Sequence, residues 1–131
     1  MKRRSTCLCT KLQLVHDGEI DKSSICHCNA CQKRTGSTYG AQVVLAKNKV
    51  SILGEFQIYN FTSDEGNLVK FHFCPNCATT LFWEITFFPD HYVAALGCFD
   101  DANIAAPTFS VYEDRKHSWV ILPDSITEHV G

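Results

Sequence analysis

The sequence predicts a mainly β protein whose twisted sheets are pinned at metal sites. Seven of the eight cysteines fall into three tight clusters, within residues 7–9, 26–31 and 74–77. The chain between the clusters consists of short runs that alternate polar and apolar residues, or that are rich in β-branched and aromatic residues, as strands are. Nine Phe and four Tyr suit the core of a β fold.

Each expected strand follows from its local pattern. Residues 11–15 alternate polar and apolar side chains, and residues 56–61 alternate in step. Residues 68–73 lead directly into Cys74 and residues 79–87 leave Cys77, which places the third cluster at a hairpin tip. The remaining strands are expected at residues 39–46, 50–53, 91–97 and 117–122. One short helix is expected over residues 29–35, where Gly36 stops it.

Length and charge limit the class of protein. A chain of 131 residues without a linker or repeat is expected to form one domain over residues 1–131. The formal net charge of −2 comes from 12 Lys and Arg against 14 Asp and Glu, and it argues against a general nucleic-acid-binding protein. No apolar run approaches the roughly 18 residues of a membrane span. We therefore expect neither a nucleic-acid nor a membrane partner.

The cysteine spacing favours metal binding over disulfides. Secreted frameworks scatter their cysteines, whereas these are two or three residues apart, in C-x-C and C-x-x-C loops whose thiolates can reach one ion. The N-terminal residues 1–6 are mostly basic and polar, so no apolar core of a signal peptide is visible. These observations predict a reducing, cytoplasmic location.

Seven thiolates divide into four and three, which predicts two zinc ions. A structural zinc takes four ligands, and a catalytic zinc takes three with one position open. The outer two pairs can close a structural site that ties the N-terminal segment to the middle of the chain: Cys7, Cys9, Cys74 and Cys77. The triplet can hold a second zinc: Cys26, Cys28 and Cys31. We favour an open second site, with His27, His72 or a distant residue as fourth ligand in the alternative, closed site.

An open zinc with three thiolates suits thiol chemistry. The three thiolates leave the ion with a net charge of −1, so it is a weak Lewis acid toward water. A coordinating thiol is nevertheless deprotonated outright and becomes a nucleophile at neutral pH. The residues therefore favour thiol or carbonyl chemistry over zinc hydrolysis, without naming the substrate.

The chain resembles the glutathione-dependent formaldehyde-activating enzyme (Gfa) family, also called the centromere protein V family. The resemblance covers nearly the whole chain and depends mainly on residues 26–36 (Cys-His-Cys-Asn-Ala-Cys-Gln-Lys-Arg-Thr-Gly), flanked by two cysteine pairs. Further matches are the C-x-C at residues 7–9, residues 73–81, residues 97–101, Pro107, Trp119 and residues 122–124.

This resemblance implies a β-tent arrangement of antiparallel sheets with two zinc ions, in the same four-plus-three division. It implies a carbon–sulfur lyase resembling S-(hydroxymethyl)glutathione synthase, with glutathione and formaldehyde as the small-molecule thiol and aldehyde. The triplet cysteines would be the ligands of the catalytic-type zinc. Lys33 and Arg34 directly follow the triplet and are candidates to pair with the carboxylates of glutathione. The alternative function is a zinc-stabilised interaction module without catalysis.

Three further expectations concern single residues. The family often has Gly directly after the first and last cysteine pairs, where this chain has Thr10 and Ala78. A residue with a Cβ that is forced to a positive φ there costs about 1–2 kcal/mol. Cys98 is expected to be a small buried apolar residue, and Trp83 and Trp119 are expected in the core.

Overall fold

The protein is mainly β with one α-helix in the part of the chain that its computed structural model describes, residues 1–20 and 22–131. No helix among these residues has the length and apolar character needed to cross a membrane. Short 3-10 turns lie at Lys47–Lys49, Leu96–Cys98 and Glu113–Arg115. The strands and the helix are β1 (Lys2–Thr6), β2 (Gln13–Asp17), β3 (Ser23–Cys26), α1 (Asn29–Thr35), β4 (Gly40–Ala46), β5 (Val50–Leu53), β6 (Gln57–Thr62), β7 (Leu68–Phe73), β8 (Thr80–Ile85), β9 (His91–Ala95), β10 (Phe109–Val111) and β11 (Glu128–His129).

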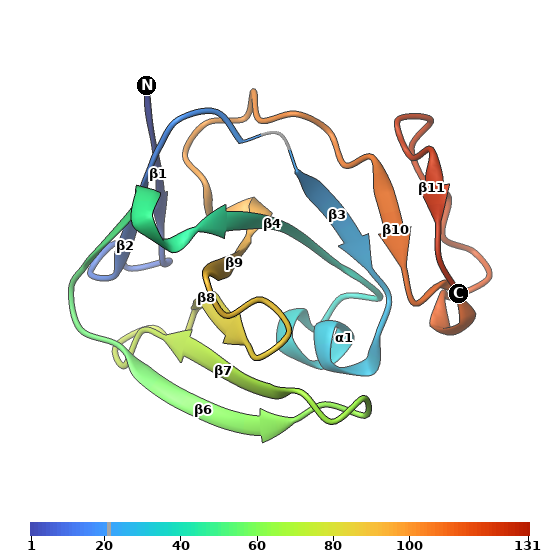
Figure 1. The fold of residues 1–131 in the computed structure, drawn as a ribbon, viewed down its shortest axis with the longest axis horizontal. Coiled ribbons are helices and arrows are strands. Elements are labelled where there is room, and N and C mark those ends of the chain that lie inside the picture. The colour runs from blue at the N-terminus through green and yellow to red at the C-terminus, as the bar shows by residue number, and fades with distance from the viewer. Residues whose placement is uncertain (21) are drawn as a thin grey trace.

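The strands form a small and a large sheet. The small sheet has the order β1-β2-β5 and is antiparallel, whereas the large sheet has the order β11-β10-β3-β4-β9-β8-β7-β6. The large sheet is mixed, because β10 runs parallel to both of its neighbours. Its strands from β3 round to β6 curve about α1 (Figure 1). The sheet therefore curves about the helix that contains Cys31 and has Cys28 as its N-cap.

Apolar side chains are buried on both faces of the large sheet, because successive residues of a strand point to opposite faces. Phe82 of β8 packs with Leu12 and Leu14 of the small-sheet region in the main core. Trp83, the next residue of β8, packs with Val93 in a second cluster. The expectation that Trp83 lies in the core is confirmed.

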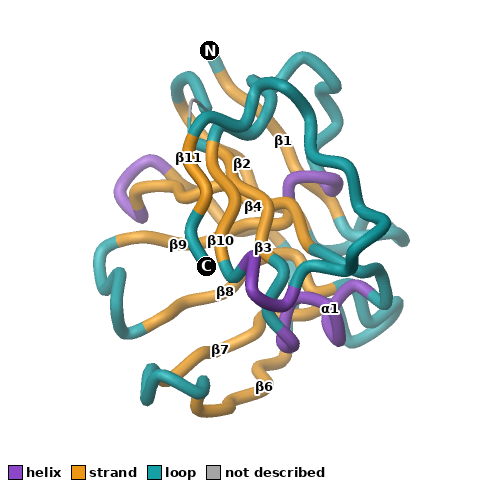
Figure 2. The backbone as a smooth tube through the Cα atoms, turned by 90° about the vertical axis from the view of Figure 1, so that its right-hand side faces the viewer, coloured by secondary structure: helices purple, strands orange, loops and turns teal. Residues whose placement is uncertain are grey.

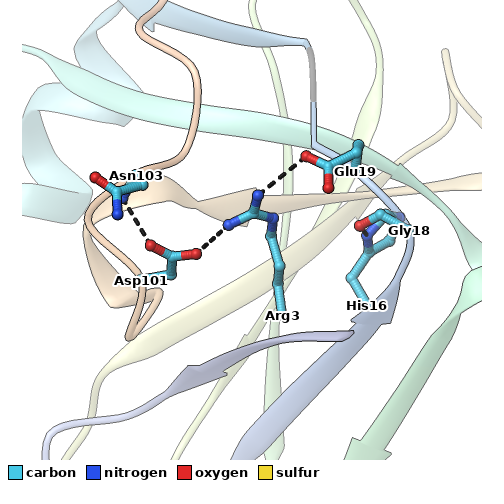
Figure 3. Close-up of polar contacts among 6 residues, drawn as sticks. All are labelled: Arg3, His16, Gly18, Glu19, Asp101 and Asn103. Carbon is cyan, nitrogen blue, oxygen red and sulfur yellow. Dashed lines mark hydrogen bonds and ion pairs between the residues drawn. The ribbon is translucent and has the colours of Figure 1, made fainter. Parts of the chain in front are cut away.

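The N-terminal strand is held by ion pairs as well as by the ladder to β2 (Figure 3). The Arg3 side chain is only 9% exposed, and its guanidinium donates to Glu19 at 3.0 Å and also pairs with Asp101. The neighbouring Arg4 donates to Asp100 at 2.8 Å. These contacts fix the segment that precedes the first cysteine pair.

Most predicted elements are confirmed, with shifts of one or two residues at the ends. The helix and the strands at β5 and β7 have the predicted bounds. The strand predicted over residues 117–122 is wrong, since these residues form a turn and irregular chain. Trp119 is 68% exposed, so its placement in the core is also wrong. Four strands, β1, β3, β10 and β11, were not predicted.

Candidate metal centres

Two turns of the chain bring four thiols together. The turn between β1 and β2 carries Cys7 and Cys9, and the turn between β7 and β8 carries Cys74 and Cys77. The four sulfur atoms lie within 4.8 Å of one another, and Cys9 Sγ is 3.6 Å from both Cys7 Sγ and Cys74 Sγ. A tetrahedral zinc with Zn–S bonds of about 2.3 Å needs sulfur atoms about 3.8 Å apart. The residues of this cluster therefore fit a four-thiolate zinc.

The two turns have equivalent backbone hydrogen bonds. In the first, the Thr10 amide donates to the Cys7 carbonyl at 3.0 Å; in the second, the Ala78 amide donates to the Cys74 carbonyl at 2.8 Å. Backbone amides also point at the sulfurs, from Leu12 to Cys7 at 3.3 Å and from Asn76 to Cys74 at 3.4 Å. Such amides stabilise a thiolate. At Cys7, burial outweighs the Leu12 amide and raises the pKa of the thiol.

Thr10 and Ala78 occupy the left-handed region of the backbone, with φ of 70° and 66°. These are the two positions at which the resemblance led us to expect a positive φ. At each position the Cβ makes this conformation sterically unfavourable, at a cost of about 1–2 kcal/mol in folding free energy. The turns therefore keep the conformation that glycine favours without having glycine.

The second cluster is built at the junction of β3 and α1. Cys26 ends β3, Cys28 is the N-cap of the helix, and Cys31 lies in its first turn. Their three sulfur atoms lie within 4.8 Å of one another. The Cys31 amide donates to Cys28 Sγ at 3.3 Å, so the helix start itself stabilises a thiolate. These residues fit a zinc with three protein ligands.

The three thiols share their protons unequally. Hydrogen bonds from Cys26 and Cys31 lower the pKa of Cys28 far below that of a free thiol. The same contacts, with burial, raise the pKa of Cys31, and the contact with Cys28 raises that of Cys26. Without a metal the cluster thus holds one thiolate and two protonated thiols. Metal binding must release those two protons.

No fourth His, Cys, Asp or Glu ligand joins this triplet among the described residues. The ring of His27 is fully buried, with Nε2 3.0 Å from Ser110 Oγ, and no nitrogen of the ring joins the three sulfur atoms. His72 instead has its Nε2 3.0 Å from Glu84 Oε2 and stacks on Phe82. Neither histidine can act as the fourth ligand in this arrangement, which favours the open site over the closed one.

A cationic side chain lies beside the triplet. The Arg34 guanidinium stands over the Trp83 ring, 4.4 Å from its centroid, and its buried Nε and Nη2 have no hydrogen-bond partner within the described residues. A Cβ at Gly40 would lie 2.7 Å from Nη2, so the glycine leaves the space that the guanidinium fills. Burial lowers the pKa of Arg34, and electrostatic interaction with the Cys31, Cys98 and Cys26 side chains opposes that shift.

Comparison with known proteins agrees with this arrangement of cysteines. The family model of the glutathione-dependent formaldehyde-activating enzyme matches residues 2–115, which contain all seven clustered cysteines. The chain belongs to this family. Membership indicates a function related to glutathione and formaldehyde.

A solved structure is similar in fold. It is a Rhodobacter sphaeroides protein, a Northeast Structural Genomics target, with a TM-score of 0.58 and 16% sequence identity over 76% of this chain and 90% of that chain. At this identity the likeness concerns the fold alone. No curated protein matches the chain.

The structure separates the two basic residues that follow the family's cysteine triplet. Lys33 is exposed to solvent, whereas Arg34 is partly buried against Trp83. The flexible, exposed Lys33 can reach a ligand that enters from solvent. The guanidinium of Arg34, packed on Trp83, instead offers N–H groups in fixed positions. The two residues therefore offer different contacts to an anionic ligand.

Two polar residues near the triplet gave no signal in the sequence. Gln42 of β4 places its Oε1 3.7 Å from Cys31 Sγ. In the sequence it is one polar residue of a strand, and nothing marks it as a residue of the site. Gln32 of α1 donates to the carbonyls of His27 and Arg115, at 2.8 and 3.3 Å, and its Oε1 contacts His117. Gln32 thus joins the helix to a segment more than 80 residues further along the chain.

Cys98 is the one cysteine outside the clusters. It is partly buried and contacts both apolar clusters. Burial raises the pKa of its thiol, which disfavours the reactive thiolate. This agrees with the expected role of a small apolar residue.

Proposed function

We propose that the protein is a zinc-dependent enzyme of the carbon–sulfur lyase type that acts on a small thiol adduct, as S-(hydroxymethyl)glutathione synthase does. The observation that carries the proposal is the three-thiol cluster, which has no fourth side-chain ligand among the described residues and lies at the start of a helix, beside a partly buried cation. The four-thiol cluster would hold a structural zinc.

The chemistry of the triplet supports a thiol ligand. A zinc ion held by Cys26, Cys28 and Cys31 would lower the pKa of a coordinating thiol and supply a nucleophilic sulfur at neutral pH. In the proposed reaction, a bond forms between the sulfur of glutathione and the carbon of formaldehyde. The carbonyl π bond breaks, the thiol loses its proton, and the former carbonyl oxygen gains a proton to become a hydroxyl group. The reaction therefore needs no redox partner.

The proposed role of the protein side chains is to bind and orient the thiol substrate. The Arg34 guanidinium, which lies close to Cys31, would receive a carboxylate of glutathione, because charge-assisted hydrogen bonds of this kind are strong. Its positive charge also offsets the net charge of −1 that three thiolates would leave on a zinc ion. The exposed Lys33 would contact a second carboxylate of the tripeptide from the solvent side.

The packing of Arg34 supports this role because it fixes the guanidinium. Trp83 is 6% exposed and is held in the second apolar cluster, so the ring that carries the guanidinium is rigid. A preorganised donor loses less conformational entropy on binding than a flexible one. Arg34 and Cys31 are also three residues apart on the helix, so both would contact one small ligand.

The proposal is tested by titrating glutathione into protein that holds two zinc ions per chain, in a calorimeter, with free zinc monitored. Saturable binding at millimolar glutathione without zinc release is expected. S-methylglutathione is the matched control: it keeps both carboxylates but has no ionisable thiol, so it should bind at least tenfold more weakly. Equal binding of both peptides would show that the thiol of glutathione does not contribute to binding. Binding of neither would favour the zinc-stabilised interaction module.

A further inference from the structure

The four sheet edges of the described residues differ in how they are protected. An edge strand presents unpaired backbone N–H and C=O groups, and proteins shorten, charge or cover such edges to prevent association. The small sheet ends at β1 and β5, and the large sheet ends at β11 and β6. The first three of these edges show such protection, and β6 does not.

The edge of β1 is covered, because Ser5 bridges to Phe99 and the Asp100 amide donates to the Arg4 carbonyl at 2.9 Å. The edge at β11 is only two residues long. The edge at β5 has four residues and follows the basic turn Lys47–Lys49. Cover thus limits association at β1 and length limits it at β11, whereas β5 offers a shorter edge than β6.

β6 is a six-residue edge that contains no charged residue, proline or glycine. It pairs with β7 in an unbroken register from Gln57 to Thr62, so no bulge bends the edge away. Large apolar side chains lie along it in partial exposure: Phe56 at 39%, Ile58 at 44% and Tyr59 at 61%. Both backbone views place β6 at the outer rim of the molecule (Figure 1, Figure 2).

The aromatic side chains give this edge a firm support. Tyr59 stacks on Phe61 at 6.0 Å between ring centroids, and Phe61 contacts Phe71 of β7 at 4.9 Å. Phe71 in turn packs edge-on against Trp83 of β8 at 5.7 Å. A row of rings therefore crosses three strands and ends with its most exposed member at the edge. A second strand beside β6 would extend that row and cover Tyr59.

We propose that β6 pairs with β6 of a second copy of this chain, antiparallel about a two-fold axis, so that the two large sheets become continuous. A neutral strand suits its own copy, because an antiparallel pair about a two-fold axis sets the residue on the axis opposite itself and its neighbours diagonally close to their own copies, so any charge would lie near its like. The paired segment is about 20 Å long, at 3.4 Å per residue. Such a contact is smaller than the interface of a permanent complex, so the dimer is reversible.

The test is sedimentation or light scattering of the zinc-loaded chain, under reducing conditions, from about 1 μM to 1 mM protein. The mean mass is expected to rise from the 14.7 kDa of one chain toward twice that value. Amide hydrogen exchange over residues 57–62 should slow as the concentration rises. A chain that stays monomeric throughout this range overturns the proposal and leaves the edge to other partners.

Variants locate the contact. Ile58→Lys is expected to weaken the dimer at least tenfold, because the new charges of two copies lie close together. Leu53→Lys is the matched control, since Leu53 is 52% exposed on the β5 edge, against 44% for Ile58; it should leave the dimer unchanged. Mixing Ile58→Lys with Ile58→Glu should restore association as a heterodimer, which also shows that both variants fold. A dimer that resists Ile58→Lys, or a mixture that stays monomeric, contradicts the pairing through β6.

Discussion

The two cysteine clusters use the same ligand atom on different backbones. The four-thiol cluster joins two equivalent turns, packs against the main apolar core and has backbone amides aimed at its sulfurs. The three-thiol cluster lies where β3 meets α1, next to the Arg34 guanidinium and the Gln42 side chain. The first arrangement ties distant segments together, and a metal ion held by its four thiols would have no free position. A metal ion held by the three thiols would keep one position for another ligand, with Arg34 and Gln42 nearby.

The difference should be greatest when one cysteine of each cluster is replaced. Cys74→Ser removes a ligand that ties the turn between β7 and β8 to the N-terminal turn. Because the binding free energy of a structural zinc, roughly 10–16 kcal/mol in small domains, becomes folding free energy, we expect this variant to be insoluble or to melt at least 15 °C lower. Cys28→Ser should lose one zinc and glutathione binding but stay folded, with a Tm lowered by a few degrees.

Metal analysis, circular dichroism and calorimetry of the two variants make the comparison. Cys98→Ser is the control, since that thiol belongs to neither cluster. A Cys28→Ser protein that unfolds while Cys74→Ser stays folded would reverse the assignment of the two sites.

The pH dependence of zinc affinity should distinguish the triplet. The pKa values of Cys26 and Cys31 are raised in the metal-free cluster, so both sulfurs are protonated at neutral pH and zinc must displace two protons. The affinity should therefore fall up to about a hundredfold for each unit of pH lowered between pH 8 and pH 6. Competition with a chelator of known affinity measures it. A pH-independent affinity would show that the cluster is already fully deprotonated.

Arg34 gives a smaller and more specific effect. Arg34→Met keeps much of the packing on Trp83 but removes the charge, and it should weaken glutathione binding about tenfold or more, since charge-assisted hydrogen bonds contribute about 1.5–3 kcal/mol. Lys33→Met should weaken binding less, because an exposed pair contributes at most about 1 kcal/mol. Calorimetry at two salt concentrations distinguishes the effects of the two substitutions on glutathione affinity. Unchanged affinity in Arg34→Met would remove this residue from the binding site.

The smallest expected effect concerns the strained turn of the four-thiol cluster. Ala78→Gly relieves the cost of a Cβ at φ of 66° while adding freedom to the unfolded chain, so it should stabilise the protein by about 1 kcal/mol or less. Ala95→Gly is the control, because Ala95 is in β9 at ordinary strand conformation and is 7% exposed; it should destabilise. Thermal melts measure both. A destabilised Ala78→Gly would mean that the alanine is not strained.

The sequence allowed most of the fold and both cysteine clusters to be predicted, because their signals are local. Spacing within C-x-C and C-x-x-C loops and alternation within strands need no knowledge of distant residues. The helix over residues 29–35 is likewise marked by its own end signal, Gly36.

The features that were missed depend on contacts far along the chain. β1 is polar and basic, and ion pairs stabilise it as a strand. Arg3 and Arg4 pair with carboxylates of distant segments: Glu19, Asp100 and Asp101. β10 forms by pairing parallel to β3, more than 80 residues earlier. Trp119 was predicted in the core because of its size, yet its segment makes no ladder and leaves it exposed. Gln42 and the inward turn of Arg34 likewise depend on tertiary packing.

The most direct test of the two-site account is stepwise removal of zinc by a mild chelator, with metal content, circular dichroism and glutathione binding followed on one sample. We predict that the first zinc leaves the triplet with the strand signal intact and glutathione binding lost, and that the second leaves only as the protein unfolds. Glutathione binding that survives loss of the first zinc, or loss of both ions together with unfolding, would contradict the division into a structural and a reactive site.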